Sequence, residues 1–388
     1  MNVAVAREGA AVRRPSVLLL VNGPGELWGW GRPLAAAVRR EGVEGGLRLL
    51  PCQFAGGEEG LLLARLPEVR GEGPEGLLPF LLRGGSSPPA AVVQLGGDLW
   101  SGRVVAGRWH VPLICYTYGF KKGLASCDLV ATAYGTMAEG FRGVRCEVVG
   151  DLVADAFTMD QGPSPWPSET LRRQEICRLA LFPGSRPAIR QEALRFLRRL
   201  VEMLRREGPE VFPVAVLSPA VGDGEAEQWR EGGMVPCRSG AGTVLPGADL
   251  AVTQPGTNTL ELLHCATPGL VVVPDAFLDK IPLGGVAGLA VRLPVLGPAL
   301  RRRALARWQG KFLAWPNRLA GREILRELVG AVTPESLARQ VGELWARAEE
   351  RASMTKSLQA LSGDSATRGG SGAAARLAAR IGEMVKIK

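Results

Sequence analysis

The stretch SVLLLVNGPGELWGWGRPLAAAVRRE (16–41) decides the fold, because it runs from a strand through a glycine loop into a helix. The apolar run 16–22 predicts a buried strand, and 32–41 predicts a helix with proline near its start. The loop between them holds Gly-Pro-Gly, one carboxylate and two tryptophans. It is either a plain strand-to-helix turn or a place where the backbone comes close to a ligand.

Apolar runs and helical segments alternate along the rest of the first half of the chain. Further strands are predicted at 46–54, 90–97, 111–119, 128–134 and 146–151. The run AAVVQLGG (90–97) is apolar apart from Gln94 and ends in glycines, as buried parallel strands do. Strands that alternate with helices predict an α/β fold with a parallel, doubly wound sheet.

A proline-rich segment divides the chain into two such units. Residues 159–175 lack apolar periodicity and contain three prolines in five positions, which is typical of a linker. The alternation of strands and helices then starts again. We expect Rossmann-like domains at 14–158 and 176–333, followed by helices at 334–388 that pack back across both domains.

Composition limits the class of protein. The 388 residues are 46% apolar and 22% charged, which is enough to fill two hydrophobic cores. No apolar run reaches the roughly 18–20 residues that a membrane span needs, and no signal peptide is evident, so we expect a cytoplasmic protein. Seven cysteines without a CxxC pair predict reduced thiols, and two histidines exclude a histidine-rich metal site.

The net charge of +9 is carried almost wholly by arginine. No nucleic-acid motif accompanies this charge, so nucleic acid is not an expected partner. The charge is either an ordinary solvated surface or an attraction for phosphorylated substrates or an anionic membrane. The segments 77–85 and 310–318 combine apolar with basic residues, and they are candidates for peripheral contact with the inner face of the membrane.

The loop after the first strand is a candidate ligand site, because ligands of doubly wound sheets bind beyond the carboxyl ends of the strands. It contains Asn22, Gly23, Gly25 and Glu26. Glycines there let a ligand approach the backbone, and the following helix offers free amide groups to an anion. The loop is not a GxGxxG motif, so a simple turn explains it equally well.

The loop after the first strand of the second unit reads Phe-Pro-Gly-Ser-Arg (182–186). Gly184 frees the backbone, Ser185 supplies a hydrogen-bond donor, and Arg186 supplies a fixed cation. The planar guanidinium suits phosphate or carboxylate. An arginine that merely lies on the surface beside a turn is the alternative.

The segment TQPGTNTLE (253–261) is a stronger candidate, because a strand end, a glycine loop and a helix start follow directly. Amide groups of Gly256, Thr257 and Asn258 can hold a pyrophosphate, each helix-dipole interaction contributing about 0.3–1 kcal/mol. Gln254 precedes them, and Glu261 lies one helical turn on, where a carboxylate can accept hydrogen bonds from ribose hydroxyls. The alternative is an ordinary capped helix with an acid in its first turn.

Three segments together resemble lipid-A-disaccharide synthases in order and spacing: PGSR (183–186), PGTNTLE (255–261) and PNRLAGREILREL (316–328). The third reads as a loop that leads into a helix at 322–328. VVGDLVADA (148–156) and the tail at 361–378 also resemble that family, so the resemblance covers roughly 15–385. It implies a GT-B glycosyltransferase with two facing Rossmann-like domains, of which the second holds most of a UDP-sugar donor.

The resemblance assigns the donor residues. Gly256 and Thr257 would approach the diphosphate, Glu261 the ribose and Arg186 a phosphate. The whole implied donor set is Gly184, Ser185, Arg186, Gln254, Gly256, Thr257, Asn258, Glu261, Asn317, Gly321 and Glu323. No metal and no separate cofactor are implied, because helix starts and arginines neutralise the phosphates.

The first domain departs from the family pattern. The opening loop lacks the family's Ser-Gly-Asp end, and TYGFKKG (117–123) replaces an aromatic segment. Asp98 in GGD (96–98) matches, but the Pro-Asp-Phe-Asn that should follow is missing. These changes indicate a retained donor site and a rebuilt acceptor site for a lipid or other glycan. Asn22, Gly23, Gly25 and Lys121 are the acceptor candidates.

The predicted reaction is an inverting glycosyl transfer, in which an acceptor hydroxyl attacks the anomeric carbon while UDP leaves. The general base is Asp98 by first choice, Glu26 by second and His110 by third. Trp28 and Trp30 either stack on a sugar, dip into lipid or pack in the core. Two alternatives stay open: a UDP-sugar 2-epimerase, and a nucleotide-sugar-binding protein without catalysis. The sequence also leaves a homodimer open.

Overall fold

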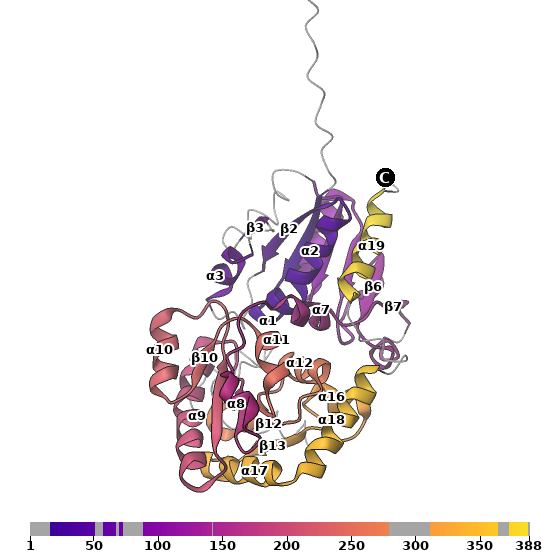
Figure 1. Ribbon diagram of the computed structural model, residues 1–388. Coiled ribbons are helices and arrows are strands. Elements are labelled where there is room, and N and C mark those ends of the chain that lie inside the picture. Colours follow the sequence, from indigo (N-terminus) through magenta and orange to yellow (C-terminus); the bar gives the residue numbers. More distant parts are fainter. Residues whose placement is uncertain are drawn as a thin grey trace, which may run out of the picture.

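The computed structural model describes residues 16–50, 57–66, 70–72, 88–141, 143–278, 311–363 and 372–386. These residues form two lobes, each built on a parallel sheet, which lie one above the other in Figure 1. The α/β, doubly wound architecture expected from the alternating segments is confirmed. The candidate membrane segment 77–85 lies outside the described residues.

The first lobe holds a seven-stranded sheet in the order β3-β2-β1-β4-β5-β6-β7. All its pairs are parallel, and Leu19 of β1 lies beside Leu47 of β2 and Val93 of β4. These three side chains are buried, as continuous apolar runs predict. The strands are β1 (Ser16–Val21), β2 (Glu44–Leu49), β3 (Arg70–Glu72), β4 (Ala91–Leu95), β5 (Leu113–Tyr116), β6 (Leu129–Thr132) and β7 (Cys146–Val148).

The helices of the first lobe connect these strands. A short helix and one turn of π-helix lead directly from β1 into α2, so the glycine loop of the sequence is itself helical. The elements are α1 (Pro24–Glu26), η1 (Leu27–Gly31), α2 (Arg32–Arg40), α3 (Glu59–Ala64), α5 (Trp100–Trp109), η2 (Leu124–Ser126), α6 (Gly135–Ala138) and α7 (Leu152–Met159).

The second lobe holds a six-stranded parallel sheet in the order β10-β9-β8-β11-β12-β13. Its strands are β8 (Cys177–Leu181), β9 (Val211–Val216), β10 (Val235–Cys237), β11 (Leu250–Thr253), β12 (Gly269–Pro274) and β13 (Arg326–Gly330). Its helical elements are α8 (Ser168–Arg172), α9 (Pro187–Glu207), α10 (Asp223–Glu231), α11 (Ala241–Val244), η3 (Leu245–Gly247), α12 (Asn258–Cys265), α13 (Asp275–Leu278) and α16 (Trp315–Ala320).

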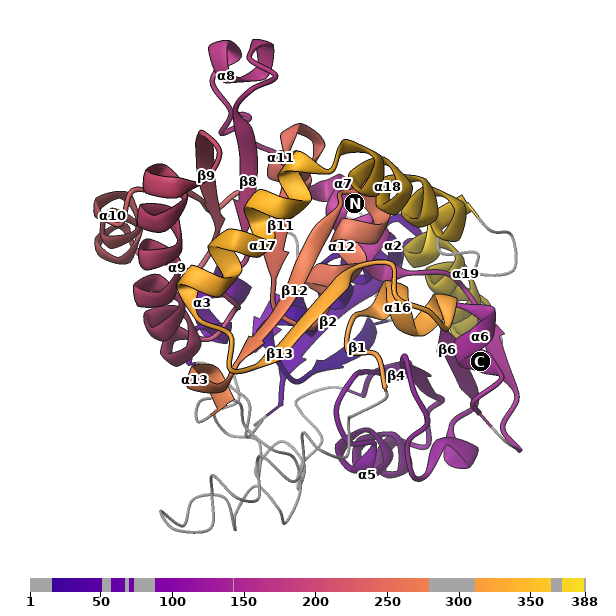
Figure 2. The same ribbon diagram turned by 90° about the horizontal axis from the view of Figure 1, so that it is seen from below.

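Three C-terminal helices cover both lobes: α17 (Pro334–Ala346), α18 (Ala348–Gly363) and α19 (Ala373–Lys386). α17 packs against α9 and lies over the second sheet in Figure 2, whereas α19 packs against α2 of the first lobe. Asp155 accepts hydrogen bonds from the backbone amides of Gly372 and Ala374, the latter at 2.6 Å. This carboxylate fixes the start of α19 against the first lobe.

One expectation about local structure is wrong. The predicted helix at 322–328 is replaced by a loop and β13, because Leu270–Pro274 of β12 offers a free parallel edge, and tertiary packing overrides the local pattern. The segment 159–175, which we expect to be a linker, lies between α7 and β8 and contains α8. Within it Trp166 is buried, with its Nε1 donating to Val244 O at 2.8 Å.

Candidate active site between the lobes

Two adjoining cavities lie between the lobes, where the carboxyl ends of the strands of the two sheets approach each other. One encloses about 90 Å³ and the other about 540 Å³. Both are lined by Gly25 from α1, Ser185 from the loop after β8, and Thr257 and Asn258 at the start of α12. The cleft therefore lies at the strand ends from which the sequence motifs project.

The start of α12 opens into this cleft. Gly256 adopts a φ of +152°, and a Cβ placed on it would meet nothing within 4 Å. No side chain caps the helix at Thr257. Thr259 is turned inward, donating to Gly256 O at 2.8 Å and accepting from Trp315 N at 3.1 Å. The helix start thus presents its amide end and positive dipole to the larger cavity.

The loop after β8 forms the neighbouring wall. Gly184 has a φ of +95°, which favours glycine, and a Cβ there would lie 3.4 Å from the Gln254 side-chain amide. Gln254 Nε2 donates to Pro183 O at 2.9 Å, so it ties the loops after β8 and β11 together. Ser185 and Arg186 line the larger cavity. Together these loops form a continuous polar wall.

Glu261 lines the smaller cavity one turn into α12. Burial is the main cause that raises its pKa to about 8, and the nearby carboxylates of Asp160 and Asp151 add to the shift, whereas Arg32 opposes it. A neutral carboxyl can donate one hydrogen bond as well as accept others. The geometry is compatible with a group that holds two neighbouring hydroxyls.

Glu26 ends α1 and lines the larger cavity. A Cβ on Gly23 would lie 2.8 Å from Glu26 Oε2, and one on Gly96 would lie 3.0 Å from Glu26 Cγ. Both glycines therefore make room for this side chain. Gly23 lines neither cavity, so it acts through Glu26 rather than on a ligand.

Lys121 lines the larger cavity, and its Nζ donates to Gly97 O at 2.6 Å. Burial lowers its pKa, partly opposed by nearby Cys115, Glu26 and Asp98. Asn22 Oδ1 accepts from Gln94 Nε2 at 3.4 Å and lies outside both cavity linings. Lys121 is thus the cation on the first-lobe side of the cleft.

The first-choice base does not line the cleft. Asp98 is exposed, its Oδ1 accepts from Trp100 N at 2.9 Å, and it belongs to neither cavity lining. The carboxylate therefore lies just before α5, whose N-cap residue is Leu99, and it is bound to the first backbone amide of that helix. His110 ends the same helix with a φ of +50° and lies outside both linings as well. Glu26 is the one base candidate of the three that both faces and lines a cavity.

The segment 316–328, which resembles the lipid-A-disaccharide synthases, is held in place by hydrogen bonds of Asn317. Asn317 is fully buried, its Nδ2 donates to Leu325 O and Glu327 Oε1, and its Oδ1 accepts from Ile324 N and Leu325 N. All four hydrogen-bonding positions of this amide are used within the protein. Asn317 is therefore a positioning residue, which corrects the expectation of a donor contact.

Two other residues of that segment also differ from the expectation. Gly321 ends α16 with a φ of +65°, and Glu323 Oε1 accepts from Glu327 N at 3.1 Å. Neither lines a cavity. The physical reason is that α16 ends at Gly321, so Glu323 lies exposed in the short loop between α16 and β13.

Arg318 and Trp315 are two cleft residues that the sequence analysis did not assign to the site. Both line the larger cavity, and the Arg318 guanidinium lies 4.0 Å from the centre of the Trp315 ring. Burial lowers the pKa of Arg318, with Glu327 opposing. The sequence did point to this place, because WPNR (315–318) overlaps the segment that most specifically resembles the lipid-A-disaccharide synthases. α16 turns these two side chains, rather than Asn317, toward the cleft.

The tryptophans of the opening loop have separate roles. Trp30 is buried, its ring packs edge-on against Tyr118 at 4.7 Å, and its Nε1 donates to the Tyr118 hydroxyl at 3.0 Å. Trp28 lines the smaller cavity, and its Nε1 donates to Asp160 at 3.3 Å. Tyr118 in turn contacts the Trp315 ring at 5.1 Å. Both tryptophans therefore border the cleft: Trp30 is buried in the first lobe and lines the larger cavity, whereas Trp28 lines the smaller one.

Within the described ranges, no group of three or more His, Cys, Asp or Glu side chains is placed to hold a metal ion. The six cysteines in this part of the chain are free thiols. No helix of the described residues combines the length and apolarity that crossing a bilayer requires.

The fold is shared with enzymes of nucleotide sugars. A putative UDP-N-acetylglucosamine 2-epimerase from Listeria monocytogenes has a TM-score of 0.58 at 15% identity and covers 95% of this chain and 95% of its own. A UDP-glucosyltransferase from Polygonum tinctorium, capable of glucosylating indoxyl, has a TM-score of 0.55 at 14% identity and covers 97% of this chain and 100% of its own. The two facing lobes define a GT-B fold.

Sequence comparison narrows this class. A lipid-A-disaccharide synthase of Myxococcus xanthus (strain DK1622) is 29% identical over 261 residues, which are 63% of this chain and 58% of that protein. One of Alkalilimnicola ehrlichii is 28% identical over 242 residues, 55% of this chain and 53% of that protein. The match thus spans little more than half of these relatives, and no protein-family model matches. The chain is a distant homologue of the lipid-A-disaccharide synthases.

Proposed function

We propose that this protein is a glycosyltransferase that moves a sugar from a UDP-sugar, similar to UDP-N-acetylglucosamine, to a lipid or other glycan acceptor. The reaction inverts the anomeric centre and needs no metal ion. The observation that carries the proposal is the uncapped start of α12, where Thr257 and Asn258 line both cavities of the cleft. The distant homology to lipid-A-disaccharide synthases supports the same reaction class.

The donor lies along the second lobe in this proposal. The diphosphate accepts hydrogen bonds from the amides of Thr257 and Asn258, and Ser185 and Arg186 lie on the adjoining wall. Arg318, stacked on Trp315, supplies a second cation at the cavity's other side. These preorganised donors stabilise the charge that develops on UDP as it leaves. Glu261 in the smaller cavity holds the ribose hydroxyls.

Glu26 is the proposed general base. Its carboxylate lines the larger cavity opposite α12, within a recess formed by two glycines. It would take the proton from the acceptor hydroxyl as that oxygen attacks the anomeric carbon and the bond to UDP breaks. A positioned base of this kind typically contributes about 10²–10⁴-fold to the rate.

The acceptor enters from the first lobe. Lys121 lines the cavity there, and the neighbouring Phe120 lines it too and is 61% exposed. A cation beside an exposed aromatic ring suits an amphiphilic acceptor with an anionic group. We therefore propose a lipid-linked acceptor, presented at the inner face of the membrane by peripheral contact.

Titration calorimetry with UDP, UMP, GDP and ADP, followed by an assay of UDP release from UDP-sugars, tests the proposal. We expect UDP to bind most tightly and UDP release to require an added acceptor and to persist in EDTA. Failure of every nucleotide to bind would contradict the proposal. Epimerisation of the UDP-sugar without an acceptor would identify an epimerase, and UDP binding without any turnover would identify a binding protein.

A further inference from the structure

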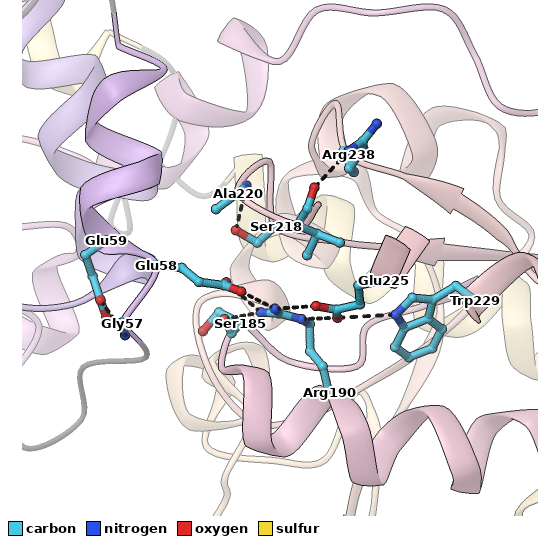
Figure 3. Close-up of polar contacts among 11 residues, drawn as sticks. Gly57, Glu58, Glu59, Ser185, Arg190, Ser218, Ala220, Glu225, Trp229 and Arg238 are labelled. Atoms are coloured by element: carbon cyan, nitrogen blue, oxygen red, sulfur yellow. Dashed lines mark hydrogen bonds and ion pairs between the residues drawn. The ribbon is translucent and has the colours of Figure 1, made fainter. Parts of the chain in front are cut away.

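Arg190, near the start of α9, lies in a polar cluster that joins the two lobes. Its side chain is fully buried between three partners: Glu225 of α10, the backbone of Ser185, and Glu58 of the first lobe. Figure 3 shows the Glu58 side chain extending from the first lobe to this guanidinium on the second lobe. The cluster lies directly behind the donor loop, because Ser185 lines both cavities.

Every N–H of this guanidinium has an acceptor. Nε and Nη2 donate to Glu225 at 2.6 and 2.9 Å, and Nη1 donates to Ser185 O at 2.7 Å. The remaining two donate to Glu58, Nη1 at 3.0 Å and Nη2 at 2.6 Å. A planar fork can satisfy two carboxylates and a carbonyl in this way, whereas an ammonium cannot.

Glu58 is the partner that the second lobe does not need for its own stability. Glu225 already neutralises Arg190 within that lobe and binds it in two places. Glu58 adds a second carboxylate to one cation, and its side chain is 19% exposed, so water can replace it when the lobes separate. The contact between Glu58 and Arg190 can therefore form and break while Arg190 stays paired.

We infer that Glu58 and Arg190 form a latch between the lobes that favours the closed cleft and positions Ser185 toward the donor. Glu58 precedes α3, whose Leu62 lines the smaller cavity. Closing the latch therefore brings Leu62 from one lobe and Ser185 from the other around the same ligand. The effect on donor affinity rests on the proposed function, whereas the effect on lobe separation does not.

The test compares Glu58→Gln with Glu44→Gln, which removes the same charge from an exposed position at the amino end of β2, away from the cleft. Fluorophores at Arg65 of the first lobe and Gln228 of α10, both exposed, report the distance between the lobes by single-molecule energy transfer. They are attached through unnatural amino acids, because the chain carries seven cysteines.

Without ligand, we expect Glu58→Gln to shift the distribution toward longer distances and Glu44→Gln to match the wild type. Arg190→Lys should shift it in the same direction, because an ammonium keeps the charge but loses the fork. UDP should bind Glu58→Gln at least about fivefold more weakly, the lower end of typical coupling between sites. An unchanged distance distribution in Glu58→Gln would overturn the latch. If UDP bound no form while the distance still shifted, the latch would stand and the donor assignment would fail.

Discussion

Gly25 of the first lobe and Thr257 of the second face each other across the cleft, and a Cβ on Gly25 would lie 3.6 Å from Thr257 Oγ1. A methyl group at that distance is in ordinary contact, but a longer side chain would occupy the space in front of the start of α12. The absence of a side chain at position 25 therefore keeps the proposed diphosphate site open.

Gly25→Leu should consequently abolish donor binding without unfolding the protein. We expect the affinity for UDP to fall more than about tenfold, because the isobutyl group fills the site that the phosphates need. Calorimetry measures the loss. Gly107→Leu is the matched control, because Gly107 lies on exposed α5 with nothing within 4 Å of a Cβ. Equal UDP affinity in Gly25→Leu and wild type would place the nucleotide elsewhere.

Glu26 and Asp98 should differ in their effect on turnover. We expect Glu26→Gln to lower kcat by about 10²–10⁴-fold with little change in UDP affinity, because the amide cannot accept the proton. Asp98→Asn should leave kcat within a factor of about three, since Asp98 lies outside both cavities. Initial rates of UDP release measure both. The reverse ranking would restore Asp98 as the base.

Arg318 should contribute to donor binding through its charge. Arg318→Met preserves contact with the Trp315 ring but removes the cation, and we expect UDP to bind about tenfold more weakly, or ~1.4 kcal/mol. Uridine, which lacks phosphates, should bind both forms alike. Arg322→Met is the control, because Arg322 lies outside both cavities and points to Ser357. An equal loss for uridine would mean that Arg318 only supports packing.

Glu261 should make stability fall as the pH rises. Its folded pKa of about 8 lies above the ordinary value of 4.5, so the folded protein holds a proton there that the unfolded chain has lost between these values. The stabilisation is complete below pH 4.5 and is lost by about pH 8. The amide of Glu261→Gln does not ionise, so this variant should keep its stability over the whole pH range.

Thermal unfolding of the two forms between pH 5 and 9 tests this expectation. Because Glu261 borders a cavity that water enters, we expect a difference on the order of 2 kcal/mol, or about 4–8 °C in Tm, in favour of Glu261→Gln at pH 9. This difference in Tm between the two forms should decrease toward pH 5. Parallel pH profiles of Tm for the two forms would show that Glu261 does not titrate in this range.

Much of the fold could be predicted from hydrophobic patterning. The buried runs that became β1, β4 and β12 are short, mostly apolar and closely followed or ended by glycine or proline, so their identity as parallel strands was readable. β13 was not, because Arg326–Gly330 opens with two adjacent charged residues, Arg326 and Glu327, and becomes a strand only beside β12. Local sequence says nothing about a neighbouring strand such as β12, where Arg326 pairs with Leu270 far earlier in the chain.

The sequence identified the loops that line the candidate site, but not always the side chains within them that face the cleft. Thr257, Ser185 and Glu26 line the cleft, because their loops follow strand ends directly. Asn317 and Arg318 are adjacent in the sequence, yet one is buried behind α16 and the other lines the cavity. Which of two neighbours faces a ligand depends on the rotation of a six-residue helix, and that rotation is set by packing against Glu327 and Leu325.

A crystal structure of the protein with UDP tests the central claim most directly. We expect the diphosphate oxygens within about 3.2 Å of the backbone nitrogens of Thr257 and Asn258, with the ribose at Glu261. UDP bound at another place, or a cleft that stays empty at a UDP concentration that saturates the protein in solution, would contradict the account.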